Sequence, residues 1–197
     1  MPANAPVPAD IQQILDDLDE ADRAADVLTS PLTDQQFMWQ PDGGTRWSVG
    51  QCLEHLAVTN ALYGEAIRKA VDRAKLAGWT RVGPLRPGFV GQKFVNSLEP
   101  PVTRRGRAPT SIRPTSKLTR SEIMRRYREA HEQLRQTARD AAGIDANRTT
   151  FSNPFLKLLK VKVSTGLHIV SAHDRRHLWQ AEQVTKSRDF PKHPVNR

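Results

Sequence analysis

The chain has 197 residues, which is enough for one substantial hydrophobic core and short for two independent domains. Its hydrophobic content of 38% and charged content of 26% are typical of a globular protein, and no apolar run approaches the roughly 20 residues of a membrane span, so we expect no membrane partner. The net charge of +9 raises the question of a nucleic-acid partner.

The N-terminal residues and the cysteine content indicate a location. Residues 1–8 lack the basic and apolar regions of a signal peptide. The single cysteine, Cys52, excludes an internal disulfide and fits a reducing compartment. We therefore expect a cytoplasmic protein, with one domain over residues 1–190 and a frayed tail over residues 191–197.

The positive charge is unevenly distributed along the chain. Much of it lies between Arg81 and Arg126 and includes the run Arg104–Arg107, whereas the first 30 residues are acidic. Such basic clusters most often form a solvated loop or helix face. A phosphate-binding surface is the alternative.

Four stretches carry apolar residues at spacings of three and four, which is the repeat of an amphipathic helix. We find no stretch with the alternation of a half-buried strand and no internal repeat. The four expected helices cover Pro8–Thr29, Val49–Leu76, Thr119–Ala142 and Ser164–Lys186. This pattern predicts an all-α four-helix bundle.

The connections between these helices differ in length. Thr33–Gln36 has the capping-box pattern of a short helical turn, and Ser48 is the expected N-cap of the second helix. Residues 78–117 form a long, basic crossover loop with a turn or two of helix at Phe89–Leu98, and a connection of this length is usually functional. Further caps are expected at Thr119, in capping-box form, and at Ser164 or Thr165.

Two histidines four residues apart lie in the expected fourth helix. His173 and His177 would project from one face, one turn apart, so that their ring nitrogens could converge on one metal ion. The same face carries the small and apolar residues Gly166, Val170, Ala181 and Val184. We therefore expect the pair to point into the bundle.

A third histidine, His55, lies at the border of the apolar stripe of the second helix. If the second and fourth helices are neighbours, His55, His173 and His177 would form a three-nitrogen metal site with one side open. A metal with an open side can lower the pKa of a bound water or thiol toward neutrality. Neither Cys52 nor Asp174 can be placed as a fourth ligand from the sequence.

Each of these residues also has a structural explanation. A His-x-x-x-His pair alone is more often structural or exposed than metal-bound, and the zinc-protease motif is rejected because Asp174 stands in place of its general-base glutamate. His131 and His168 fall near apolar stripes and fit hydrogen-bonded core histidines. Cys52 fits a small core residue better than a nucleophile. Packing roles are expected for Trp39, Trp47 and Trp179.

Two motifs favour the metal interpretation over these alternatives. Trp47–Leu56 resembles the tryptophan-serine and Glu-His-Leu motif in the second helix of the DinB/YfiT superfamily. His173–Gln180 resembles that family's fourth-helix motif, two histidines four apart followed by glutamine. The order and separation of the two motifs match as well, and so does the turn at Leu32–Gln35.

The resemblance implies a four-helix bundle whose metal-binding triad is His55, His173 and His177, often assembled as a homodimer. The family's metal is typically a divalent ion such as zinc or nickel. Characterised relatives include enzymes that activate a low-molecular-weight thiol, such as bacillithiol or mycothiol, for transfer or isomerisation.

The sequence therefore predicts a metal-binding bundle that acts on a small-molecule substrate as a thiol-dependent transferase or a related hydrolase. Water or a thiol would take the open position, and basic side chains of residues 78–117 would attract an anionic cosubstrate. Gln180 could hydrogen-bond a bound group or a ligand histidine. The alternatives are a nucleic-acid-binding protein that uses Arg104–Arg107, and a non-catalytic dimer stabilised by metal.

Overall fold

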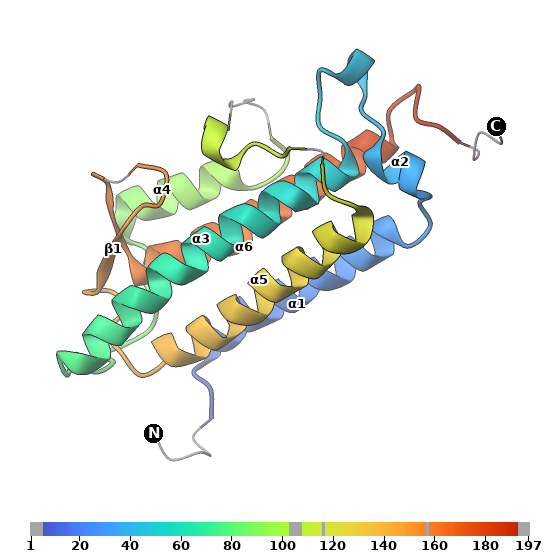
Figure 1. Cartoon of the computed structure of the whole chain (residues 1–197). Coiled ribbons are helices and arrows are strands. Elements are labelled where there is room, and N and C mark those ends of the chain that lie inside the picture. Colours follow the sequence, from blue (N-terminus) through green and yellow to red (C-terminus); the bar gives the residue numbers. More distant parts are fainter. Residues whose placement is uncertain (1–5, 103–107, 116, 157, 193–197) are drawn as a thin grey trace.

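A computed structural model describes residues 6–102, 108–115, 117–156 and 158–192. Its long helices are α1 (Ala9–Thr29), α3 (Val49–Leu76), α5 (Arg120–Ala141) and α6 (Val163–Thr185). Helix α3 packs on α5 and α6, and α1 closes the bundle by packing on the same two helices. Figure 1 shows α1 and α6 running in one direction and α3 and α5 in the other. The predicted all-α bundle is confirmed, and each long helix lies within a residue of its predicted bounds.

Shorter elements fill the connections. They are α2 (Asp34–Met38), the 3-10 turns η1 (Asp42–Gly44) and η2 (Thr110–Ile112), α4 (Gly88–Leu98), β1 (Thr150–Ser152) and β2 (Lys160–Lys162). The two strands pair antiparallel, with Phe151 opposite Val161. The prediction of no strand is wrong for this hairpin, because segments of three residues are too short to show alternation.

The caps predicted at Ser48 and Thr33 are present, and both are reciprocal, although of these two a capping box was predicted only at Thr33. Ser48 Oγ accepts a hydrogen bond from the backbone N–H of Gln51 at 3.0 Å, and Gln51 Oε1 accepts one from the backbone N–H of Ser48 at 2.9 Å. Thr33 and Gln36 form the same pair before α2. These contacts satisfy amide groups that the start of a helix leaves unpaired.

The two later caps differ from the predictions. Thr119 Oγ1 accepts from the backbone N–H of Glu122 at 3.3 Å, but the Glu122 carboxylate pairs with Arg126, so the capping box is only half formed. Helix α6 begins after Lys162, which makes no side-chain cap.

Ser164 and Thr165, the expected caps of α6, hold the start of α4 instead. Ser164 Oγ donates to the carbonyl of Arg86 at 3.1 Å, and Thr165 Oγ1 donates to the carbonyl of Pro87 at 2.8 Å. Gly91 makes the close approach of the two helices feasible, because a Cβ there would lie 2.8 Å from the Thr165 methyl carbon. The hydroxyls are therefore used for tertiary contacts.

The crossover between α3 and α5 is more ordered than expected. Its helix, α4, has 11 residues, where the sequence suggested a turn or two, and it packs along α6. Arg81 pairs with Asp10 of α1 at 2.6 Å, which ties the start of the crossover to the bundle. The basic run Arg104–Arg107 lies outside the described residues.

A buried ionic network joins the long helices across the core. The side chain of His131 in α5 is fully buried, with its Nδ1 2.8 Å from Asp22 Oδ1 of α1 and its Nε2 3.4 Å from Asp174 Oδ2 of α6. Asn60 of α3 donates to Asp174 Oδ1 at 2.7 Å. Burial alone would lower the pKa of His131, but the carboxylates of Asp174 and Asp22 outweigh it and raise this pKa to about 9.

The stability of the fold is therefore expected to depend on the protonation of His131. Its pKa is about 9 in the folded chain and ordinarily 6.5, so its contribution is complete below about pH 6.5 and is lost as the pH rises through 9. The expected loss is on the order of 3 kcal/mol. Urea unfolding across this range measures it as the difference in stability between the parent protein and His131→Gln. A difference that stays constant with pH would contradict the assignment.

The chain beyond α6 folds back over the bundle. The Phe190 ring meets Trp39 edge-on at a centroid distance of 5.5 Å, and Gln36 Nε2 donates to the carbonyl of Pro191 at 2.7 Å. The predicted frayed tail is thus held as far as Pro191, and residues 193–197 lie outside the described part of the chain. Within the described residues, the structure contains no helix that is both long and apolar enough to cross a membrane.

Candidate metal centre

Three histidines converge between α3 and α6, as the sequence predicted. One ring nitrogen of each of His55, His173 and His177 can be chosen so that all three lie within 4.8 Å of one another. The ring centroids are 4.6 Å apart for His55 and His177 and 4.5 Å apart for His173 and His177. Nitrogen atoms this close can share one ion, so the group could hold a metal.

The fold points these side chains inward. His55 and His177 are buried and His173 is half-buried, in line with the apolar face predicted for α6. The ring of Trp47 lies against two of them, with centroid distances of 4.9 Å to His55 and 5.8 Å to His177. The sequence suggested only a packing role for Trp47. The structure places it as a wall of the site.

A backbone contact sets the orientation of His55. Its Nδ1 lies 2.8 Å from the carbonyl oxygen of Ile112 in η2. A carbonyl only accepts, so Nδ1 carries the proton and Nε2 keeps its lone pair. Metal-binding histidines usually donate their second N–H in this way. No sequence pattern indicated this contact, because it depends on where the crossover returns to α3.

Burial keeps the three imidazoles neutral. It lowers the pKa of His55 and, with the charges of His55 and Arg176, lowers the pKa of His173 to about 3. The pKa of His177 lies well below its usual value because of burial and the neighbouring histidines and Arg176. Neutral imidazole is the form that binds a metal ion, so the cluster is prepared for one at neutral pH.

The described residues supply no fourth ligand. Asp174 turns away from the cluster toward Asn60 and His131, and no other group of histidine, cysteine and carboxylate ligands occurs in the described residues. Cys52 is buried among apolar side chains, and burial raises the pKa of its thiol, so it is a core residue and no thiolate nucleophile. The arrangement is that of an open site.

Two polar side chains of α6 border the cluster. Gln180 lies beside His177 and opposes the fall of its pKa, although Nδ1 of His177 has no hydrogen-bond partner. Arg176 follows three residues after His173, and its charge acts on both His173 and His177. Arg176 was not among the residues predicted for the site, although its spacing of three from His173 places the two side chains next to each other on the helix.

The other histidines make local contacts. His131 belongs to the buried ionic network, and His168 Nδ1 lies 2.8 Å from the carbonyl of Ser164 one turn earlier. Both fit the expected structural roles.

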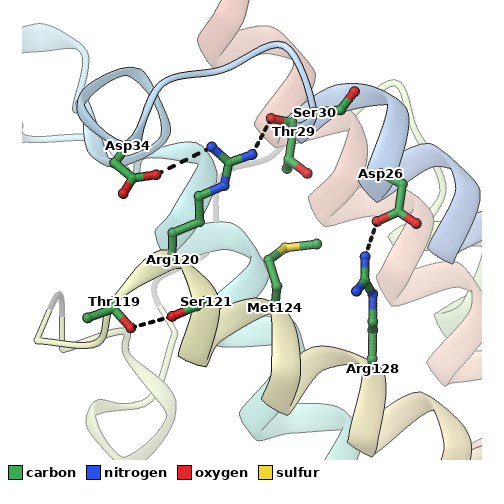
Figure 2. A pocket seen from close by; sticks show the side chains of 9 residues that line it. All are labelled: Asp26, Thr29, Ser30, Asp34, Thr119, Arg120, Ser121, Met124 and Arg128. Atoms are coloured by element: carbon green, nitrogen blue, oxygen red, sulfur yellow. Dashed lines mark hydrogen bonds and ion pairs between the residues drawn. The ribbon is translucent and has the colours of Figure 1, made fainter.

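One hollow of the structure lies away from the cluster, between α1, α2 and the start of α5 (Figure 2). Its volume is about 550 Å³, and none of the three histidines lines it. Arg120 donates to the carbonyl of Thr29 at 2.6 Å and lies 3.4 Å from Asp34, while Arg128 pairs with Asp26 at 2.6 Å. These contacts join the helices across the hollow. They account for the two arginines there, so no bound ligand is needed to explain them.

Two further basic residues of α5 have acidic partners. Arg125 pairs with Glu129 at 2.6 Å, and Arg126 pairs with Glu122 at 2.5 Å. Both pairs are exposed and four residues apart, which is typical of a solvated helix face. This observation favours the structural explanation of that cluster over a phosphate-binding surface.

Comparison with known proteins agrees with the two motifs. The chain matches the model of the DinB superfamily over residues 17–181, a range that contains all three histidines. No curated protein and no solved structure gave a significant match. The family match covers most of the chain and therefore includes most of the bundle and its histidine cluster, as the two motifs predicted. The chain belongs to the DinB superfamily.

Proposed function

We propose that this protein is a metal-dependent enzyme that uses His55, His173 and His177 to hold a divalent ion and that transfers or hydrolyses a group with the help of a small thiol. The observation that carries the proposal is the convergence of three imidazole nitrogens within 4.8 Å, with no fourth ligand among the described residues. Zinc and nickel are the ions we expect, because imidazole suits both.

The residues fit such an ion in three respects. The imidazoles are held neutral by burial. The proton of His55 is fixed on Nδ1 by the carbonyl of Ile112, which leaves Nε2 for the ion. The buried Nδ1 of His177 has no hydrogen-bond partner. Buried polar atoms are normally paired, so a bound ion would account for this nitrogen. When bound, the ion would stabilise the thiolate form of a thiol near neutral pH.

The chain itself would orient and shield the reacting thiol. Trp47 lies against two of the histidines and would shield that side of a bound group from water. Arg176 supplies a positive charge beside His173 and His177, where an anionic group of the thiol or of its cosubstrate could bind. Gln180 could hydrogen-bond a ligand histidine or the bound group.

Metal analysis of the untagged protein tests the first step. We expect one zinc or nickel ion per chain, and a rise in melting temperature when either ion is added to the chelator-treated protein. A protein without a divalent ion, whose melting is unchanged by zinc and nickel, would overturn the proposal.

The thiol can be tested separately by optical spectroscopy. Cobalt substituted for the native ion should develop a sulfur-to-cobalt charge-transfer band when bacillithiol or mycothiol is added. A cobalt-loaded protein that never shows this band, and that turns over no thiol, would be the non-catalytic metal-stabilised protein.

Replacing Arg176 by glutamine is expected to weaken the binding of an anionic thiol by about tenfold or more, because a hydrogen bond to a charged group contributes roughly 1.5–3 kcal/mol. The uncharged 2-mercaptoethanol should bind the variant and the parent equally. Arg68→Gln, which alters an exposed ion pair of α3, is the matched control. An equal change for both thiols would show that Arg176 does not recognise the anion.

A further inference from the structure

Helix α4 carries apolar residues on its outer face as well as on its inner face. Its inner face packs on the core through Val95 and Leu98. Its outer face exposes Phe94 and leaves Phe89 and Val90 exposed to 75% and 80%. The same outer face also carries exposed polar residues, so α4 presents apolar side chains among polar ones, and these apolar side chains stay exposed to solvent in the single chain.

The loop between β1 and β2 exposes a second set of apolar side chains, Leu156, Leu158 and Leu159, of which Leu158 is 100% exposed. Hydrogen bonds of Asn153 hold the start of this loop. Asn153 Oδ1 accepts from the backbone N–H groups of Phe155 and Leu156 at 2.9 Å, and Asn153 Nδ2 donates to Tyr63 Oη at 2.8 Å. The Phe155 ring turns inward onto Tyr63, at a centroid distance of 5.6 Å. The leucines are therefore directed outward by the contacts at the base of the loop.

These two apolar sets are neighbours. Strand β2 leads directly into α6, whose Thr165 binds the carbonyl of Pro87 just before α4. The Nζ atom of Lys162 lies 3.8 Å from the position that a Cβ on Gly88 would take. Figure 1 likewise shows the hairpin beside the N-terminal half of α4, at one end of the bundle. We call the exposed apolar residues of α4 and of the loop, with the exposed basic residues among them, the α4–hairpin surface.

This surface is positively charged. The sequence has no aspartate or glutamate between Asp72 and Glu99, and none between Asp145 and Asp174. The exposed basic residues of the surface are Arg86, Lys93, Lys160 and Lys162. The Nζ atom of Lys93 lies 4.4 Å from the centroid of the Phe89 ring. A positive charge therefore lies directly against an exposed apolar side chain.

We propose that the α4–hairpin surface binds the face of an anionic phospholipid membrane. Its leucine and phenylalanine side chains enter the boundary between headgroups and acyl chains, and its lysines and Arg86 contact the headgroups. Such a contact needs no spanning helix, in agreement with the absence of one from the described residues. It revises the expectation of no membrane partner, which rested only on the length of apolar runs.

The positive charge of the α4–hairpin surface distinguishes between its possible binding partners. A second copy bound through the same surface about a two-fold axis would place these cations opposite each other, which is repulsive. Nucleic acid would satisfy the cations but would leave the exposed leucines in water. An anionic bilayer offers negative charge and an apolar layer together. The proposal is independent of the metal centre, which lies further along α6.

Vesicle cosedimentation of the full chain tests the proposal. We expect the protein to bind vesicles of phosphatidylcholine mixed with phosphatidylserine, to bind pure phosphatidylcholine vesicles at least about tenfold more weakly, and to be released by salt. The double variant Phe89→Ser/Leu158→Ser should lose roughly tenfold or more of the binding, as should Lys160→Glu/Lys162→Glu. The matched control is Val27→Ser, which removes a side chain that is 75% exposed on acidic α1.

Each other outcome overturns the proposal. The proposal fails if the protein does not bind the anionic vesicles. It also fails if Phe89→Ser/Leu158→Ser binds them as well as the parent does, or if Val27→Ser weakens the binding as much as that double variant. Sedimentation velocity is run on the same proteins. A dimer that dissociates in Phe89→Ser/Leu158→Ser would assign the surface to a second copy. All substituted side chains are exposed, and circular dichroism with thermal melting confirms that the variants fold.

Discussion

His177→Ala is expected to weaken the binding of zinc or nickel by more than about 100-fold, since loss of an outer-sphere partner alone typically weakens metal binding 10–100-fold. The side chain of His177 is buried between those of His55 and His173, with centroid distances of 4.6 and 4.5 Å. Its removal leaves two imidazoles for an ion that the parent protein would hold with three. Competition with a chromogenic chelator measures the dissociation constant directly.

The chain offers a matched control on the same helix. His168 is half-buried, and its Nδ1 lies 2.8 Å from the carbonyl of Ser164, away from the cluster. His168→Ala should therefore bind metal as the parent does. His55→Ala should lose metal affinity as His177→Ala does. His55 lies in α3, but the ion would bridge the two helices. Equal affinities in His177→Ala and His168→Ala would exclude the triad as the metal site.

The stabilisation by metal should disappear in the same variants. An ion at 100 times its dissociation constant stabilises the folded state by about 2.7 kcal/mol. The melting temperature of the parent should therefore rise on addition of zinc or nickel, while those of His55→Ala and His177→Ala should not change. Circular dichroism of the metal-free proteins checks that the variants keep their helices.

Asp174→Ala is expected to lower the free energy of unfolding by about 3–5 kcal/mol, the usual effect of removing one partner from a buried ion pair. Asp174 is 1% exposed. Its loss leaves the amide of Asn60 without its acceptor and His131 with Asp22 as its remaining carboxylate partner. Urea unfolding in the presence of a chelator measures this loss without any contribution from bound metal.

Asp72→Ala is the control for Asp174→Ala. Asp72 pairs with Arg68 on the exposed side of α3, where both side chains are 50% exposed. Its removal should change the free energy of unfolding by less than about 0.5 kcal/mol. If Asp174→Ala lost less than about 1 kcal/mol, the network would not hold α5 and α6 together as described.

The sequence alone determined the bundle and the members of its histidine cluster. The start of α3 was predicted at the right residue, because the cap at Ser48 fixes it locally. The spacing of His173 and His177 put both rings on one face, because helical geometry is the same in every protein. His55 was assigned to the group by its motif, and the structure brings it there.

Contacts between residues far apart in the chain were decided only by the tertiary structure. Asp174 and His131 were each visible in the sequence, but their pairing depends on how α5 and α6 pack. The contact between His55 and the carbonyl of Ile112 likewise depends on packing. So do the hydrogen bonds of the Ser164 and Thr165 hydroxyls, which were predicted to cap α6 but bind the backbone just before α4. Local pattern fixes helices and faces, whereas buried polar groups take the partners that packing brings within reach, and those partners carry no sequence signature.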